Sequence, residues 1–215
     1  MPKSRRKLSA VLRDFHTELR RLERFDAENQ ARFSASLGTA QPSTLSKHQL
    51  HFLTEAVFFR AYRAYESFVR DTFLLYCLEK RPRSGARVVS FLNPRSFQHA
   101  ERLIQSSMPF LDWKSPDTIL DRAEIYLKDG FPIKLPYATH REVLQDFRKI
   151  RNHIAHDSKE SLNGYKQVLR KHYGTIPLKI PSPGEFLLVR DKKNPKKYKL
   201  LIFFDVMSKL SNDLT

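Results

Sequence analysis

Apolar residues along most of the chain recur every three or four positions, the spacing of an α-helix with one buried face. This pattern predicts a first helix over residues 4–33 and a longer one over Lys47–Glu79. Further helices are expected to begin at Asn93-Pro94 and Ser115-Pro116, because Asn and Ser cap helices well and Pro fits the first helical position. Ser34–Ser46, rich in Ser and Thr, is predicted to be a loop.

The second half of the chain carries three more predicted helices. They are Thr139–Ala155, with Thr139 as its cap, then Lys159–Tyr173, and last Tyr198–Leu214. Prolines exclude a helix from Ile176–Gly184, and the apolar run Phe186–Val189 is predicted to be extended. We find no internal repeat or low-complexity tract, so the sequence predicts an all-α bundle that forms one domain over the whole chain, 1–215.

The charge of the chain adds a class of partner to this picture. Lys and Arg total 39 against 23 Asp and Glu, which gives a formal net charge of +16 at pH 7. Such an excess favours nucleic acid as a partner. No apolar stretch approaches the roughly 18 residues that a membrane span needs, and the first residues lack the apolar core of a signal peptide. The sequence therefore predicts a cytoplasmic protein with no membrane contact.

The cysteine content and the missing motifs exclude several kinds of site. Cys77 is the only cysteine, so a disulfide scaffold and a multi-thiolate metal centre are both excluded. It lies in the apolar run Phe73–Leu78, where a buried and unreactive thiol is expected. There is no Gly-rich phosphate loop and no carboxylate pair at an active-site spacing, which excludes P-loop hydrolysis and glycoside chemistry.

The segment Arg148–Asp157 concentrates the residues that carry chemistry. Arg151 is followed by the polar Asn152, and His156 lies five positions after the arginine. An apolar helix leads into this segment, and a short helix follows it. In these features the sequence resembles the HEPN superfamily, whose mark is an Arg with a polar neighbour, a few residues and then a His. The long helix before the motif resembles that of this superfamily, especially of its RiboL-PSP-like branch, at Tyr62, Tyr65, Glu66, Phe68 and Val69. The resemblance in organisation covers about residues 50–210.

The resemblance implies an α-helical, HEPN-like bundle with long N-terminal helices and short irregular loops. It also implies a homodimeric, metal-independent RNA endonuclease of the kind found among toxins and phage-defence proteins, with an antitoxin or defence-system protein as a further partner. Many members of the superfamily have lost activity, so a silent module that binds RNA or a partner protein stays open as the alternative. A third alternative is a toxin that is paired with a nucleotidyltransferase.

Metal-independent cleavage of RNA needs the residue types of this motif and no cofactor. His156 is the candidate general acid and base, because histidine exchanges protons near neutral pH. Arg151 is the candidate that stabilises the doubly charged phosphorane through paired hydrogen bonds. Asn152 has a lesser role, in which it holds the phosphate or orients a neighbour. In the alternative, non-catalytic interpretation, His156 is a surface cation that is favourable near a helix C-terminus.

Helical geometry suggests that two copies of the chain share the site. On an ideal helix Arg151 lies about 140° round from His156 and roughly 7.5 Å along the axis. Asn152 and His156 face away from the predicted core stripe, which consists of Val143, Phe147, Ile150 and Ile154. We therefore expect a second copy across a two-fold axis to complete the site. The other solution is a helix that loosens near Ala155.

Two further residues are candidates for supporting roles. Glu66 is either a salt-bridge partner of an arginine or a residue that supports the site from behind. His153 supports the motif, and together with His156 and Asp157 it forms the nearest approach to a metal-binding set. Because a third histidine or a further acidic ligand is missing, no metal is predicted.

Basic side chains gather in three places that suit a phosphate backbone. Arg148 and Lys149 flank the motif, and a second cluster surrounds Asp191. This second cluster comprises Arg190, Lys192, Lys193, Lys196, Lys197 and Lys199, and a third comprises Lys80, Arg81, Arg83 and Arg87. We predict RNA contacts at Arg148, Lys149, Lys192, Lys193, Lys196 and Lys197. The alternative is that each cluster is a solvated loop.

Overall fold

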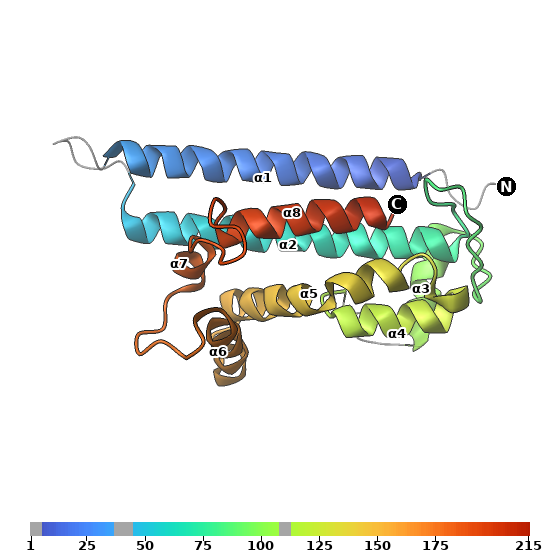
Figure 1. The fold of residues 1–215 in the computed structure, drawn as a ribbon. Coiled ribbons are helices and arrows are strands. Elements are labelled where there is room, and N and C mark those ends of the chain that lie inside the picture. The colour runs from blue at the N-terminus through green and yellow to red at the C-terminus, as the bar shows by residue number, and fades with distance from the viewer. Residues whose placement is uncertain (1–5, 37–44, 108–112) are drawn as a thin grey trace. The chain divides into compact units, whose positions relative to one another are not determined.

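The computed structural model describes residues 6–36, 45–107 and 113–215, and over these ranges the chain is helical with no strand or sheet (Figure 1). This confirms the predicted all-α fold class. The helices are α1 Leu8–Ser36, α2 Lys47–Cys77, α3 Phe97–Ser107, α4 Pro116–Tyr126, α5 Lys134–Ala155, α6 Lys159–Tyr173, α7 Pro183–Leu187 and α8 Lys199–Asp213, and a short 3₁₀ turn, η1, covers Lys128–Gly130.

Local cap chemistry sets the starts of α4 and α6, and in both helices the predicted start agrees with the observed one. Ser115 caps α4 by accepting from the Thr118 N–H, and Pro116 takes the first helical position. In α6 the Ser158 side chain accepts from the backbone of Ser161 while the Ser161 side chain accepts from the backbone of Ser158, which is a reciprocal capping box. The two predicted starts are confirmed to within two residues.

The start of α5 differs from the prediction. The helix begins at Lys134, and Thr139 lies inside it, with its hydroxyl donating to the Leu135 carbonyl at 2.9 Å, so Thr139 is no cap. Pro136 is compatible with this earlier start, because the first turn of a helix uses no backbone donor there.

Three other boundaries also differ. The helix expected at Asn93 starts at Phe97, because Ser96 supplies the cap by accepting from the His99 N–H at 3.1 Å. Helix α2 ends at Cys77 rather than Glu79, and Glu79 takes a left-handed φ of 59°. Helix α1 continues to Ser36, into the predicted loop; the rest of that loop up to residue 44, and residues 4 and 5 of the predicted first helix, lie outside the described ranges.

The segment expected to be extended near residue 186 is partly helical. Phe186 and Leu187 belong to α7, where the Ser182 hydroxyl accepts from the Glu185 N–H at 3.1 Å. Pro183 takes the first helical position directly after this cap. A Ser-Pro cap therefore decides the conformation of a run that apolar content alone suggested to be a strand.

The described residues form two compact units, and each of α1, α2, α5 and α8 contributes to both. The first unit contains the chain up to His16 together with Ala64–Gln145 and Met207–Thr215. The second unit contains Thr17–Arg63 and Asp146–Val206. Among the described residues, no helix is long and apolar enough to cross a membrane.

Aromatic stacking and a buried cysteine characterise the core of the first unit. Phe15 stacks on Phe68 with ring centroids 4.8 Å apart, and Phe73 lies 5.3 Å from Trp113. Cys77 is fully buried, and burial raises the pKa of its thiol to about 12. The predicted burial of Cys77 is confirmed, and its thiol carries almost no thiolate at neutral pH.

Phe203 lies at the centre of the aromatic core of the second unit. Its ring centroid is 4.6 Å from that of Phe58 on α2 and 5.0 Å from that of Phe147 on α5, and Tyr62 stacks against it. Since Phe147 lies one turn before Arg151 on α5, this packing fixes the end of the helix that carries the motif.

Asp26 is a buried carboxyl group in the second unit. Its Oδ2 accepts from the Tyr198 hydroxyl at 2.6 Å and from Gln30 Nε2 at 3.4 Å. Burial raises the pKa of Asp26 above its ordinary 3.8, and the two hydrogen bonds oppose this only in part. A raised pKa in the folded state means that the folded chain holds the proton more tightly than the unfolded chain. The contribution of Asp26 to the free energy of unfolding therefore falls as the pH rises through the interval between the two pKa values.

Asp26→Asn is expected to gain stability relative to the wild type as the pH rises, because the amide accepts from Tyr198 and carries no charge to desolvate. Urea unfolding of both proteins at pH 4 and pH 7.5 measures the effect as the difference between their free energies of unfolding. Glu28→Gln, which removes an exposed carboxylate from the same helix, is the control. If the free energy of unfolding of Asp26→Asn, relative to that of the wild type, is no larger at pH 7.5 than at pH 4, then the pKa of Asp26 does not affect stability in this way.

Candidate functional site

The three motif residues lie at the C-terminal end of α5 and differ in exposure. Arg151 and Asn152 belong to its last two turns, and His156 is the first residue after it, with its N–H donating to the Asn152 carbonyl at 2.9 Å. His156 is exposed, Asn152 is half-buried, and Arg151 is only 5% exposed. The structure thus presents the histidine to solvent and holds the arginine inside the second unit.

Arg151 packs against an aromatic ring. Its guanidinium carbon lies 5.2 Å from the centroid of Phe59, a residue of α2 in the same unit. Stacking on a ring holds a guanidinium group by its face and leaves hydrogen bonding to its edge. Of the predicted core stripe on α5, Phe147 and Ile150 are buried whereas Val143 and Ile154 are half-buried.

The Ser161 hydroxyl group connects the motif to α6. It lies 2.5 Å from the His156 carbonyl and 2.9 Å from the Ser158 carbonyl, and its single proton can be donated to only one of them at a time. His153 Nδ1 lies 3.4 Å from the same oxygen. Sequence reasoning missed Ser161, because it stands at the third helical position, where the recognisable capping-box signal has Glu or Gln. This network fixes the backbone that carries His156.

His153 is half-buried and packs against α6. Its ring stacks on Tyr165 of α6, with centroids 4.9 Å apart and an interplanar angle of 22°. Burial lowers the pKa of His153, and the charges of Asp157 and Glu55 oppose this only in part. His153 is therefore neutral at pH 7, and its contacts are those of a residue that joins α5 to α6.

Glu66, the candidate for a supporting role on α2, is half-buried. Within the described ranges, no group of three or more His, Cys, Asp and Glu side chains is placed to hold a metal ion.

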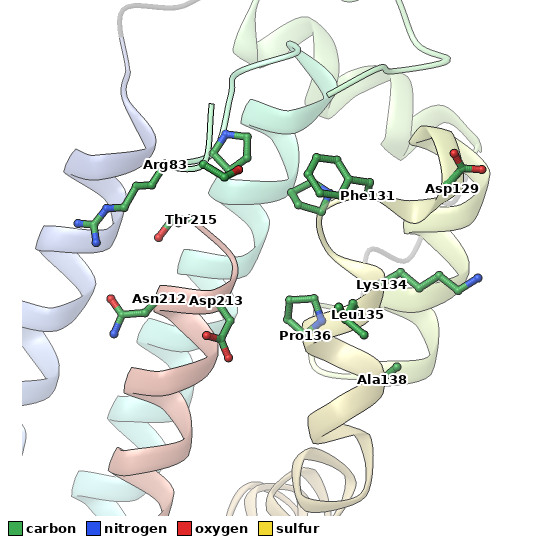
Figure 2. Close-up of a pocket in the computed structure, with 13 residues that line it drawn as sticks. Arg83, Asp129, Phe131, Lys134, Leu135, Pro136, Ala138, Asn212, Asp213 and Thr215 are labelled. Carbon is green, nitrogen blue, oxygen red and sulfur yellow. The ribbon is translucent and has the colours of Figure 1, made fainter. Parts of the chain in front are cut away.

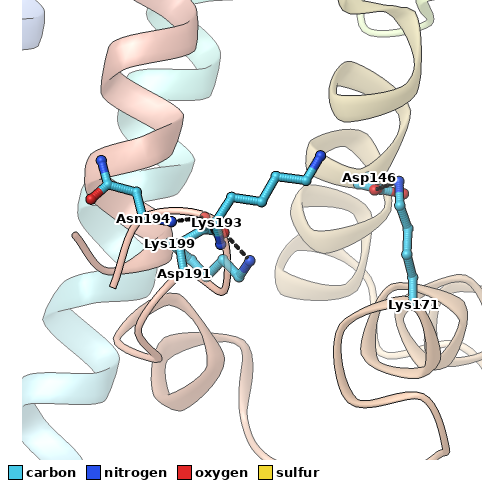
Figure 3. Close-up of polar contacts among 6 residues, drawn as sticks. All are labelled: Asp146, Lys171, Asp191, Lys193, Asn194 and Lys199. Carbon is cyan, nitrogen blue, oxygen red and sulfur yellow. Dashed lines mark hydrogen bonds and ion pairs between the residues drawn. The ribbon is translucent and has the colours of Figure 1, made fainter. Parts of the chain in front are cut away.

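The two basic residues that flank the motif are both half-buried. Arg148 and Lys149 precede Arg151 on α5. On the same helix, Asp146 forms an ion pair with Lys171 of α6, with Oδ2 and Nζ 2.6 Å apart (Figure 3). That contact ties α5 to α6 on a second side, in addition to the Ser161 network, so the positive charge of Arg148 and Lys149 is carried by a well-fixed helix.

The basic segment after α7 is an ordered loop organised around Asp191. The carboxylate accepts from the backbone N–H groups of Lys193 at 2.9 Å and Asn194 at 3.0 Å, and it pairs with Lys199 Nζ at 2.5 Å (Figure 3). An antiparallel bridge between Arg190 and Tyr198 closes the loop. The one acidic residue of the cluster is thus used to shape the loop.

The predicted RNA-binding lysines of this loop fall into two groups. Lys192, Lys193 and Lys196 are exposed. Lys197 is half-buried, and its ammonium group pairs with Asp205 of α8 at 2.7 Å. Three of the four lysines are therefore displayed to solvent, whereas the fourth has a structural ion pair.

An exposed histidine on a rigid helix end can transfer protons to and from a bound molecule, and exposed lysines in the same unit can attract a polyanion. The resemblance to the HEPN superfamily rests on the motif residues that supply this chemistry. No protein-family model matches the chain, and neither a curated protein nor a solved structure is significantly similar to it.

Proposed function

We propose that this chain is a metal-independent endoribonuclease of the HEPN type, which acts as a cytoplasmic homodimer in a toxin or phage-defence role. The observation that carries the proposal is the exposed His156 directly after α5, five positions beyond Arg151, on a backbone that the Ser161 network holds. In this role an antitoxin or another defence protein would keep the enzyme inactive until it is needed.

The proposed reaction needs only proton transfer and charge stabilisation. His156 removes the proton of a ribose 2′-hydroxyl, whose oxygen attacks the adjacent phosphorus. Arg151 stabilises the phosphorane, and the bond to the 5′-oxygen breaks as that oxygen takes up a proton. His156 gives the proton it took to that oxygen, so the same side chain acts first as base and then as acid. Asn152 holds the phosphate or orients its neighbour.

Cleavage of a mixed RNA pool in the presence of EDTA tests this mechanism. We expect cutting to persist, the products to end in 2′,3′-cyclic phosphate, and RNA with a 2′-deoxy substitution at the cut to resist, because the 2′-oxygen is the nucleophile. Loss of activity on chelation and its return with zinc or magnesium would show that a metal performs the chemistry instead.

The second candidate function is a catalytically silent module that binds RNA or a partner protein. The burial of Arg151, with 5% of its surface exposed, favours this reading, since a transition-state clamp must reach the phosphate. Wild-type protein that binds RNA and never cuts it, under the conditions of the cleavage assay, would decide for the silent module.

Binding to RNA is expected to weaken steeply with salt, because lysines that neutralise phosphates release condensed counterions. A triple variant with Lys192→Gln, Lys193→Gln and Lys196→Gln should lower the affinity. The slope of log affinity against log salt concentration should also become less steep by about 2, the value for three phosphate contacts to a single strand. Fluorescence anisotropy with a labelled RNA measures both quantities.

The matched control removes the same charge from another surface of the second unit. Arg20→Gln, Arg24→Gln and Arg32→Gln replace three exposed cations on α1. An equal loss of affinity in both triple variants would mean that only net charge matters. An unchanged salt slope in the lysine variant would place the path of the RNA elsewhere.

A further inference from the structure

The first unit contains an apolar hollow of about 500 Å³ between the start of α5 and the end of α8 (Figure 2). Its apolar lining comprises Pro82, Phe131, Pro132, Leu135, Pro136 and Ala138. Phe131 is exposed and Leu135 is 77% exposed, so both can contact a molecule that enters the hollow. The volume lies within the range of small-ligand sites, about 300–1,000 Å³.

A second hollow of about 240 Å³ adjoins the first and has the opposite character. We call it the cationic hollow, because its lining includes Arg6, Lys7, Lys80, Arg81 and Arg83. Arg6 also pairs with Asp71 at 2.6 Å, which fixes one wall. The remaining lining includes Leu8 and Ser9, in the first turn of α1, where backbone N–H groups have no partner within the helix.

Arg83 joins the two hollows. Together with Pro82 and Thr215 it lines both of them. Its backbone N–H donates to the Thr215 carbonyl at 2.5 Å, and in Figure 2 its side chain extends past Thr215 toward α1. Arg83 thus belongs to both linings, and its side chain extends toward α1, whose first residues line the cationic hollow.

We propose that the two hollows together bind a nucleotide, with the base in the apolar hollow and the phosphate in the cationic hollow. A base is flat and apolar on its faces, which suits a lining of rings and prolines, and a phosphate suits several Arg and Lys side chains. Asp129 and Asp213 line the apolar hollow and repel phosphate, so charge sets the orientation. Asp213 also offers an acceptor to the amino groups of a base.

This inference does not rest on the proposed ribonuclease activity, because none of the lining residues belongs to the motif on α5. The same chemistry can come from a free mononucleotide or from the 5′ end of an RNA strand. The experiment therefore uses AMP as one probe and a short 5′-phosphorylated oligoadenylate as the other. The oligoadenylate is tested with His156→Ala protein, so that cleavage does not affect the measurement.

Isothermal titration calorimetry of the full chain with AMP, adenosine and ribose 5-phosphate tests the base and the phosphate separately. We expect adenosine and ribose 5-phosphate each to bind about tenfold or more weakly than AMP, since each lacks one half of the ligand. Arg83→Gln and Leu135→Asp should each lower the affinity for AMP by about tenfold. Both side chains are exposed, and a thermal melt verifies that each variant is folded.

Arg87→Gln is the matched control, because Arg87 is an exposed arginine of the same segment that lines neither hollow. If only the oligoadenylate binds and shows the same pattern of variants, a strand end is the source of the nucleotide. The proposal is overturned if neither probe responds more to Arg83→Gln and Leu135→Asp than to Arg87→Gln. It is also overturned if ribose 5-phosphate binds as tightly as AMP.

Discussion

His156→Ala is expected to lower the rate of RNA cleavage about a hundredfold or more, the usual loss when a positioned general acid or base is removed. Its stability should not change, because the His156 side chain is exposed and its contacts with Asn152 and Ser161 are made by the backbone. Single-turnover cleavage and a thermal melt of the same preparation measure the two effects independently.

Two other histidines serve as controls for this prediction. His48→Ala removes an exposed ring from α2 in the second unit and should change neither rate nor stability. His153→Ala should give a milder loss of rate together with a lower melting temperature, because it removes the ring that stacks on Tyr165. Full activity in His156→Ala would exclude the proposed mechanism.

Arg151→Ala is expected to lower cleavage about a hundredfold or more, as removal of one strong transition-state donor does. Unlike His156→Ala, it should also lower the free energy of unfolding by about 1 kcal/mol or more, because a buried side chain loses its contact with Phe59. Rate measurements under conditions where each variant is fully folded separate the two effects. Arg170→Ala, an exposed arginine on α6, is the matched control and should change neither quantity.

Mixed dimers show whether the two residues act across the two-fold axis. When Arg151→Ala and His156→Ala chains are combined, a site built from one residue of each chain is intact in one of its two copies. Cleavage should then recover in the mixture although each variant alone is inactive. If both residues act within one chain, every site carries a defect and no activity returns.

Cap chemistry could be predicted from the sequence because it depends on adjacent residues. Ser115-Pro116 marked the start of α4 for this reason, whereas the Ser158 cap of α6 appeared only in the structure. The extended conformation assigned to Phe186 was wrong because apolar content does not distinguish a strand from a short helix, and the deciding signal was the Ser182 cap beside it.

The candidate site was only partly predictable. A helical wheel gave the exposed position of His156, since it depends on local periodicity. The burial of Arg151 depends on Phe59, which lies 92 residues earlier in the chain, and no local pattern reports such a contact. Lys197 likewise looked equal to its neighbours, and its ion pair with Asp205 depends on how the loop returns to α8.

The contacts of Asp191 have a consequence for the entropy of RNA binding. A flexible basic segment loses conformational freedom when it settles on a phosphate backbone, at a cost of about 1–2 kcal/mol for each residue that becomes ordered. Here one carboxylate already holds two backbone N–H groups and the Lys199 ammonium group, so the loop is ordered in the free protein. Lys192, Lys193 and Lys196 can then contribute their attraction to phosphate with only their side chains left to order.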